Sequence, residues 1–385
     1  PSAASWSWAG KQPPQSWRSS VADWCALPFT PEELGAKGDG TTNDSAAFAA
    51  LGRSLTMNGG GRVVLRPVTY VVGWQEPGGE GYAFQRKDLL KFVNCTNPVT
   101  ITGTGATMKA DAGLKYGAFD PQTGERIDLP MPLYDGQYIG NAYRGMIHAE
   151  GCASVTVRGV ELDGNSASLT LGGEWGDSQR QLEAHGIYLR DNLSALVEDV
   201  YSHHHGGDGM QIMAPGLEVG DAERPHILRR VLCRFNGRLG LADTGSNCIL
   251  AEDCDFSQQG QVFNGEERLN TAPGAGVDIE PEASVTRDAT FTRCTFKANY
   301  RGPGLIGASG NSADVTFREC VFSGETSGAF VAAKPGYTLE DCVLVGYTNF
   351  ALPADPPSTY TLTRCVFSVD PDYTETGVVD TRQSI

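Results

Sequence analysis

One segment carries two carboxylates two residues apart, in Gly-Ala-Gly-Val-Asp-Ile-Glu-Pro over residues 274–281. If this segment is a strand, Asp278 and Glu280 lie on one face, about 6.7 Å apart at the backbone. Paired carboxylates disfavour a strand and therefore require a reason. Glycoside hydrolysis uses two carboxyl groups, about 5–5.5 Å apart in retaining enzymes and about 6.5–9.5 Å apart in inverting ones. Crowding also raises the pKa of one carboxyl group, which makes it a general acid.

Two further aspartates could join this pair, Asp208 in Gly-Asp-Gly-Met and Asp243 in Leu-Ala-Asp-Thr-Gly. In a coiled chain, neighbouring coils bring side chains about 4.8 Å apart. We therefore predict Asp278, Glu280, Asp208 and Asp243 as the catalytic carboxylates. Asp243 falls at an inward position of the strand pattern, so it must lie at a turn or the register must change there. The alternative for all four is a polar role in turns and at the solvated surface, without chemistry.

A second group of candidates precedes these carboxylates. His185, Tyr188 and Arg190 belong to one short alternating segment. Such a set suits proton abstraction beside a uronate carboxylate, with arginine neutralising the developing charge. A lyase or epimerase is therefore the second interpretation. We predict six substrate-binding residues, which are His185, Tyr188, Arg190, His205, Gln211 and Trp175.

Three consecutive histidines, His203, His204 and His205, raise the question of a metal. Consecutive residues of a strand or turn point in different directions, so three in a row cannot easily ligate one ion. The sequence also has no Cys-x-x-Cys pair. We expect no metal and no cofactor.

A repeated sequence phrase, or motif, centred on a cysteine indicates the structural element that must position these residues. Most steps between its copies are 21 to 26 residues, with one longer step of 40. Within each copy apolar and polar residues alternate, as strands require. Short strands that recur at this spacing can bury their apolar faces by stacking into a parallel β-helix. We expect an internal column of free thiols from the six cysteines of the phrase, Cys233, Cys254, Cys294, Cys320, Cys342 and Cys365.

A second repeated phrase, which begins with glycine, marks another face of the coil and predicts which of its residues point inward. The first and third residues after each glycine should point inward, and the second and fourth outward. The expected inward residues include Ile187, Leu189, Met210, Ile212, Val277 and Ile279. The expected outward residues are Tyr188, Arg190, Gln211, Met213, Asp278, Glu280, Phe330 and Ala332.

The N-terminal part supplies a cap for this coil. Asn43 or Asp44 should begin a helix whose buried face carries Phe48, Leu51 and Leu55. The glycine-rich stretch from residue 35 to this helix, followed by Gly-Gly-Arg-Val-Val-Leu at 60–65, resembles the N-terminal signature of the pectate-lyase-like right-handed parallel β-helix superfamily. That superfamily includes polysaccharide lyases, glycoside hydrolases, phage tailspikes and alginate epimerases. The resemblance implies the fold and does not fix the reaction.

The predicted fold class is thus all-β, a right-handed parallel β-helix with an N-terminal capping α-helix. We expect a Trp-rich irregular extension at 1–30 and one β-helix domain at 31–385. Groove-forming loops are expected near 111–145, 165–184 and 258–275, where the coil pattern is interrupted. The tryptophans of the extension and the resemblance to tailspikes suggest a homotrimer.

Charge and hydropathy exclude several classes of partner. The net charge of −16 argues against nucleic acid and anionic membranes, and the sequence has no apolar run long enough to span a bilayer. The expected partner is a poly- or oligosaccharide substrate, and the expected location is extracellular or virion-associated. The first interpretation is a glycoside hydrolase or transglycosylase. The second is a lyase or C5-epimerase acting on a uronate polymer, and the third is a non-catalytic carbohydrate-binding or tailspike-like adhesion protein.

Overall fold

A computed structural model describes most of the chain beyond the N-terminal segment. The described residues are 28–78, 81–129, 136–175, 182–281, 283–300, 304–307, 311–324, 328–332, 336–351, 360–368, 372–374 and 379–382. Most of the predicted Trp-rich extension, residues 1–27, lies outside them. So do parts of two predicted loops, at 130–135 and 176–181.

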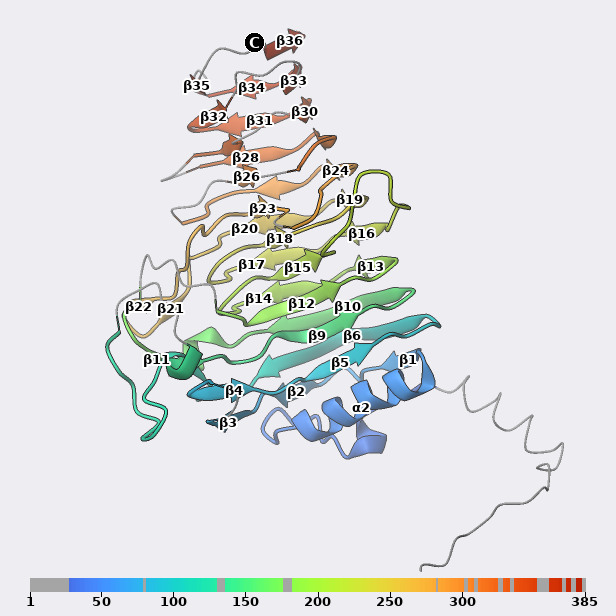
Figure 1. Ribbon diagram of the computed structural model, residues 1–385, viewed down its shortest axis with the longest axis vertical. Helices are drawn as coiled ribbons and strands as arrows, with labels where there is room; N and C mark the ends of the chain where they lie inside the picture. Colours follow the sequence, from blue (N-terminus) through green and yellow to red (C-terminus); the bar gives the residue numbers. More distant parts are fainter. Residues whose placement is uncertain are drawn as a thin grey trace, which may run out of the picture.

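The body is a right-handed parallel β-helix, as predicted, in which each strand pairs in parallel with a strand one coil later (Figure 1). Two of its three faces share the long strands β6 (Val99–Ala110) and β10 (Val155–Asp163). The first face adds β1 (Gly61–Val64), β13 (Ala195–Glu198), β16 (His226–Arg229), β19 (Ile249–Glu252), β24 (Ala289–Thr292), β27 (Val315–Arg318), β30 (Tyr337–Glu340), β33 (Tyr360–Thr363) and β36 (Val379–Arg382). The second adds β2 (Thr69–Val72), β14 (Tyr201–His203), β17 (Leu232–Arg234), β20 (Asp255–Ser257), β25 (Thr295–Phe296), β28 (Val321–Ser323), β31 (Val343–Val345) and β34 (Val366–Phe367).

The third face, here called the groove sheet, contains the predicted glycine-led strands. It consists of β5 (Leu90–Val93), β9 (Gly145–Glu150), β12 (His185–Arg190), β15 (Met210–Met213), β18 (Leu241–Asp243), β23 (Val277–Ile279), β26 (Leu305–Gly307), β29 (Phe330–Ala332), β32 (Thr348–Ala351) and β35 (Asp372–Thr374). The predicted alternation holds for Ile187, Met210 and Val277, which share one buried inward column. The prediction that Phe330 and Ala332 point outward is wrong. Phe330 pairs with Leu305 in the inward column, because Ala329 and not Gly328 occupies the position of the leading glycine.

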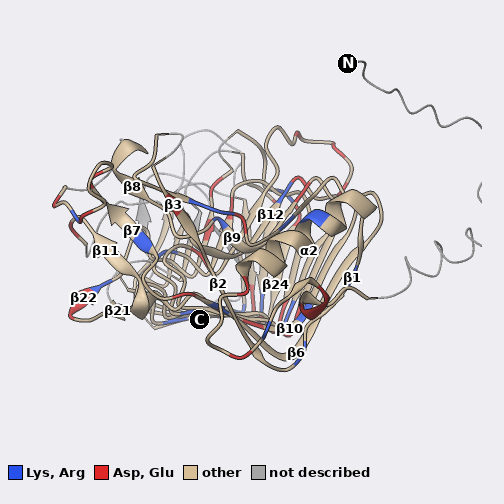
Figure 2. Ribbon diagram, turned by 90° about the horizontal axis from the view of Figure 1, so that it is seen from below, with Lys and Arg blue, Asp and Glu red and all other residues tan. Residues whose placement is uncertain are grey.

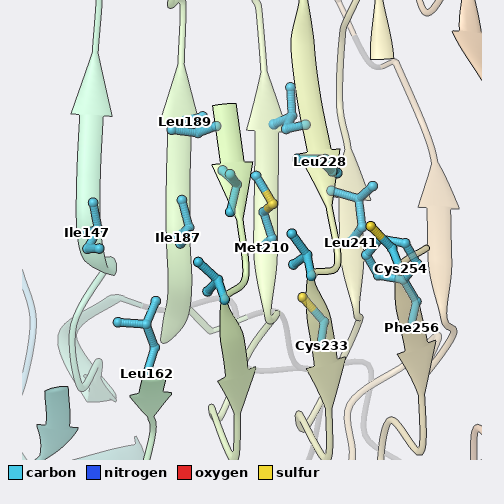
Figure 3. Close-up of a cluster of buried hydrophobic side chains, with 14 of the residues drawn as sticks. Ile147, Leu162, Ile187, Leu189, Met210, Leu228, Cys233, Leu241, Cys254 and Phe256 are labelled. Atoms are coloured by element: carbon cyan, nitrogen blue, oxygen red, sulfur yellow. The ribbon is translucent and has the colours of Figure 1, made fainter. Parts of the chain in front are cut away.

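The core is a stack of like side chains on successive coils (Figure 3). The strand registers place Cys254, Cys294, Cys320, Cys342 and Cys365 in one interior column, and all are buried free thiols. Cys233 departs from the prediction, because it pairs with Phe256, two residues beyond Cys254. A shift of two residues keeps every side chain on the same face, so alternation alone cannot detect it.

This burial predicts a difference in thiol chemistry between the native and unfolded protein. The thiolate is the reactive form of cysteine, and a thiol sealed in an apolar interior neither ionises readily nor meets reagent. A disulfide-forming thiol reagent should leave Cys294, Cys320 and Cys342 unmodified in the native protein and modify all three in denaturant. Peptide mass spectrometry measures the modification, and a disulfide among these residues would contradict the free-thiol column.

A helix closes the first coil. Helix α2 (Ser45–Asn58) lies across the end of the stack (Figure 2) and buries Phe48, Leu51 and Leu55, as predicted. Asp44 occupies the N-cap position, but its carboxylate accepts hydrogen bonds from the Lys37 and Gly38 amides at 2.7 and 3.0 Å. The capping aspartate therefore also holds the preceding glycine-rich turn against the helix. A short 3-10 helix, η1 (Pro31–Leu34), precedes it.

Much of the interrupted middle of the chain forms strands rather than irregular loops. A separate five-stranded sheet lies beside the coils. It consists of β3 (Gln75–Pro77), β4 (Phe84–Arg86), β7 (Lys115–Ala118), β8 (Ile139–Gly140) and β11 (Thr170–Gly172). Two 3-10 turns, η2 (Gly136–Tyr138) and η3 (Ser166–Ser168), lie in the same interruptions, and the hairpin β21 (Phe263–Asn264) and β22 (Glu267–Arg268) forms in the third. Strand pairing satisfies backbone groups that a long buried loop would leave without partners. Among the described residues, no helix is long and apolar enough to cross a membrane.

Candidate functional site

The outer surface of the groove sheet brings several predicted site residues into one column. The registers align Lys91, His148, Tyr188, Gln211, Ala242 and Asp278 on six successive coils. Tyr188, Gln211 and Asp278 therefore point outward, as the alternation predicted. Glu280 follows directly after β23 and continues the strand by donating its amide to the Asp243 carbonyl at 2.9 Å.

Asp278 is a buried carboxyl group in a partly apolar recess. Its side chain is 4% exposed, and its Oδ1 has no hydrogen-bond partner among the described residues. The neighbouring Ala242 packs with Leu239 and Ala275 in a small buried cluster outside the coil. Burial raises the pKa of Asp278 to about 7, assisted by Glu280, Asp208 and Asp243 and opposed by Arg238. Near neutral pH this group is therefore poised to donate a proton.

Asp208 has the opposite electrostatic character. It is fully buried, and its carboxylate contacts Arg238 Nη1 at 3.3 Å and His185 Nδ1 at 3.2 Å, and accepts the Leu239 amide at 3.2 Å. Burial alone would raise its pKa, but the Arg238 and His185 charges and these hydrogen bonds outweigh it and hold the pKa below its usual range. Asp208 therefore orients His185 and Arg238.

Asp243 lies inside the coil. It shares an inward column with Ile212 and Ile279, so the register does not change there and the residue is not at an outward turn. Its carboxylate accepts hydrogen bonds from the Gly245 amide at 3.1 Å, Ser246 Oγ at 2.9 Å and Thr286 Oγ1 at 3.1 Å. Burial raises its pKa to about 6. The expectation that Asp243 joins the outward carboxylates is contradicted by this placement, and its role is to tie two coils together.

Tyr188 is the centre of a cluster of rings and cations. Its ring meets His148 edge-on at 4.8 Å, stacks on His185 at 6.0 Å and lies 5.5 Å from the Arg144 guanidinium. Burial raises the pKa of Tyr188, and the Arg144 and Arg190 charges oppose that rise. The cluster brings together a phenol, two imidazoles and two guanidinium groups, with Tyr188, His148 and His185 all buried.

His148 was not predicted from the sequence. It is 1% exposed, and neither ring nitrogen has a hydrogen-bond partner among the described residues. Burial, and then the Lys91, Arg144, Arg86 and Arg190 charges, lower its pKa to about 3. The imidazole is therefore neutral at physiological pH, and the same environment makes it a weak base. The glycine-led pattern gave no signal for it, because counting from Gly145 places His148 inward, whereas the strand register aligns Met146 and not Gly145 with Gly186.

A basic hollow of about 480 Å³ adjoins this cluster. It is lined by Tyr82, Gln85, Arg86, Lys87, Asp88, Lys91 and Arg144, which include four basic side chains and one acidic side chain. Glu183 pairs with Arg86 at 2.6 Å and with Arg144 at 2.9 Å. Glu76 pairs with Lys87 at 2.5 Å and Asp88 with Lys91 at 3.5 Å, so three carboxylates offset most of the positive charge of the hollow.

The two remaining predicted contacts lie away from the groove sheet's outer surface. His205 is fully buried inside the coil, where Nδ1 shares a 2.9 Å hydrogen bond with the Tyr143 hydroxyl, so its predicted contact with substrate is contradicted. Trp175 stacks on Tyr116 at 5.3 Å and donates Nε1–H to the Gly172 carbonyl at 3.1 Å. Its observed role is to pack the interruption against the core.

The family of the chain follows from comparison with known proteins. The family described as "Right handed beta helix region" matches residues 145–344. The chain belongs to the right-handed β-helix family. No curated protein matches its sequence.

Several solved structures share the fold at low sequence identity. ORF18 of Geobacillus virus E2 is 12% identical with a TM-score of 0.53, covering 95% of this chain and 63% of that one. The A-module of the Azotobacter vinelandii mannuronan C-5 epimerase AlgE4 is 15% identical with a TM-score of 0.42, covering 92% of this β-helix chain and 99% of the other. The exopolygalacturonase of Thermotoga maritima is 11% identical with a TM-score of 0.39, covering 94% and 96%. Likeness at this level concerns the fold alone.

Proposed function

We propose that this protein is a carbohydrate-active enzyme that hydrolyses, or transfers by transglycosylation, glycosidic bonds of a poly- or oligosaccharide bound along the groove sheet. The observation that carries the proposal is Asp278, an outward carboxyl group whose pKa is raised to about 7 two residues before a second carboxylate, Glu280. Glycoside hydrolysis uses two neighbouring carboxyl groups, one of which has a raised pKa and serves as the acid.

In this mechanism Asp278 donates its proton to the oxygen of the leaving sugar. Glu280, about 6.7 Å away along the strand, activates the water that attacks the anomeric carbon. This backbone spacing is compatible with the carboxyl separation of either retaining or inverting enzymes. Asp208 acts as a positioning residue for Arg238 and His185 through its 3.3 and 3.2 Å contacts. Tyr188, Gln211 and Arg190 are proposed to contact sugar rings on the neighbouring coils.

A second reaction is favoured by one specific observation, the neutral His148 beside Tyr188 and Arg144. In this reaction the imidazole takes the proton at C5 of a uronate, and the guanidinium groups neutralise the carboxylate. The Tyr188 phenol then donates a proton to the opposite face of C5 in an epimerase, or to the leaving oxygen as its bond to the ring breaks in a lyase. The enzyme would then be a lyase or C5-epimerase. A non-catalytic adhesion protein is the third candidate. The homotrimer and the extracellular or virion-associated location remain predictions.

The three candidates are separated by incubating the purified full chain with a panel of neutral and uronate polysaccharides. For a hydrolase, mass spectrometry should find shorter chains whose summed mass exceeds that of the parent by one water per bond cleaved, with no ultraviolet absorbance from an unsaturated uronate. An absorbing product would replace the hydrolase with a lyase. Binding to a polysaccharide without any change in its mass or configuration would favour the adhesion protein.

A further inference from the structure

We propose that Asp163, His203 and His204 form a binding site for a first-row transition-metal ion, with Zn²⁺ as the probe of choice. The site lies where β10 and β14 end, on the second face of the coil and not on the groove sheet. The ligand atoms of these three residues all lie within 4.8 Å of one another. Two imidazoles and one carboxylate are a donor set suited to zinc and its neighbours rather than to calcium or magnesium.

The backbone explains how consecutive histidines converge. His204 adopts a left-handed conformation with φ of 55°, which turns its ring back toward that of His203. The two Nδ1 atoms face each other at 2.6 Å. In a regular strand these side chains would point to opposite faces, which is why the sequence argued against a metal.

A carboxylate on the other side of His203 holds its ring in place. Glu161 Oε1 lies 3.0 Å from His203 Nε2, and Glu161 Oε2 accepts the Thr107 hydroxyl at 2.7 Å. A carboxylate can only accept, so Nε2 carries a proton and Nδ1 of the neutral ring accepts a hydrogen bond from His204 Nδ1–H. A bound ion would release that shared proton to solvent. A carboxylate behind a ligating histidine is the usual outer partner of such metal sites.

Neighbouring rings hold both imidazoles in place. His203 stacks on Tyr201 at 4.0 Å, and His204 stacks on Phe235 at 5.3 Å. An ion bound at about 2.0–2.1 Å from each nitrogen needs them about 2.9–3.4 Å apart. The rings must therefore open by less than about 1 Å to admit the ion.

The third ligand approaches from the preceding coil. Asp163 Oδ1 lies 3.9 Å from His203 Nδ1 and accepts the Asn165 amide at 2.8 Å. Lys109 Nζ lies 3.4 Å from Asp163 Oδ2 and competes with a cation for this carboxylate. Asp163 and Lys109 also line an open hollow of about 630 Å³, which gives an ion a path from solvent. The bound ion would link two successive coils.

The test uses the full chain stripped with a chelator and titrated with Zn²⁺ by calorimetry, and with Co²⁺ by visible absorbance. We expect uptake of about one equivalent. His204→Asn should abolish it, since asparagine tolerates the left-handed backbone but has no imidazole. Asp163→Asn serves as a second ligand variant. Glu161→Gln should weaken affinity about 10–100-fold without removing a ligand, and Lys109→Gln should strengthen it.

A matched control separates this site from nonspecific binding. Asp199 is an exposed aspartate that precedes β14, is also left-handed with φ of 55°, and pairs with Arg230 at 2.6 Å. Asp199→Asn should leave the titration unchanged. No uptake by the unmodified chain, or equal uptake by folded His204→Asn and Asp163→Asn variants, would overturn the proposal.

Discussion

Replacing Asp278 by asparagine should lower turnover at least about 100-fold while the protein stays folded. Asparagine keeps the size of the side chain and removes the proton that the leaving sugar must receive. General acid–base assistance is worth about 10²–10⁴ in rate, so the loss should fall in that range. Steady-state assays on the polysaccharide identified in the panel measure it, and Glu280→Gln should have a loss of similar size.

Asp243→Asn is the matched comparison for this variant. Asp243 has a buried carboxyl group with a pKa raised to about 6, one coil from Asp278, but it faces the interior. Its replacement should therefore leave turnover close to that of the unmodified enzyme. If Asp278→Asn and Glu280→Gln instead keep near-normal turnover while His148→Gln or Tyr188→Phe is inactive, proton abstraction at a uronate becomes the better account.

Asp278→Asn should also make the folded protein more stable than the unmodified protein at alkaline pH. The pKa of Asp278 is about 7 in the folded state and about 3.9 in an unfolded chain, so the folded state holds this proton more tightly. The contribution is most favourable below about pH 4, is lost as the pH rises toward 7, and stays constant above that. At about 1.4 kcal/mol per pKa unit, the loss is at most about 4 kcal/mol. The asparagine of Asp278→Asn does not titrate, so this variant should not lose this free energy of unfolding as the pH rises.

Urea unfolding of both proteins at pH 5 and pH 8 measures this effect. The difference between variant and unmodified protein is the useful quantity, because other groups titrate too. His148, with its pKa lowered to about 3, gives stability that rises with pH up to about 6.5, and this cancels in the difference. An equal pH dependence in the two proteins would mean that Asp278 is solvated, and its role as an acid would lose its physical basis.

The fold was predictable because it repeats. Each coil buries the same positions, so the column of Cys294, Cys320 and Cys342 could be read from alternation and period. Alternation fixes which face a residue occupies, but not its partner on the next coil. Cys233 and Phe330 were assigned the wrong partners for this reason. Both were aligned by residue type in the repeated motifs, whereas the structure pairs them with residues at other motif positions.

The site was predictable only where it follows the strands. Tyr188, Gln211 and Asp278 were placed correctly by their parity. Asp243 and His205 were not placed with them, because a coil interior can also hold polar side chains that satisfy its turns, and sequence does not distinguish these from exposed groups. The rings of His203 and His204 converge because the backbone of His204 is left-handed. Alternation along a strand does not predict such a residue.

Cleavage in isotopically labelled water tests the central claim most directly. Hydrolysis breaks the bond between the anomeric carbon and the leaving oxygen and adds a water oxygen to the new reducing end. We expect mass spectrometry to find one labelled oxygen per cleavage, on the anomeric carbon, and little product from Asp278→Asn under the same conditions. Unlabelled products with an unsaturated terminal uronate, or full labelling by the Asp278→Asn enzyme at the normal rate, would contradict hydrolysis by this carboxylate pair.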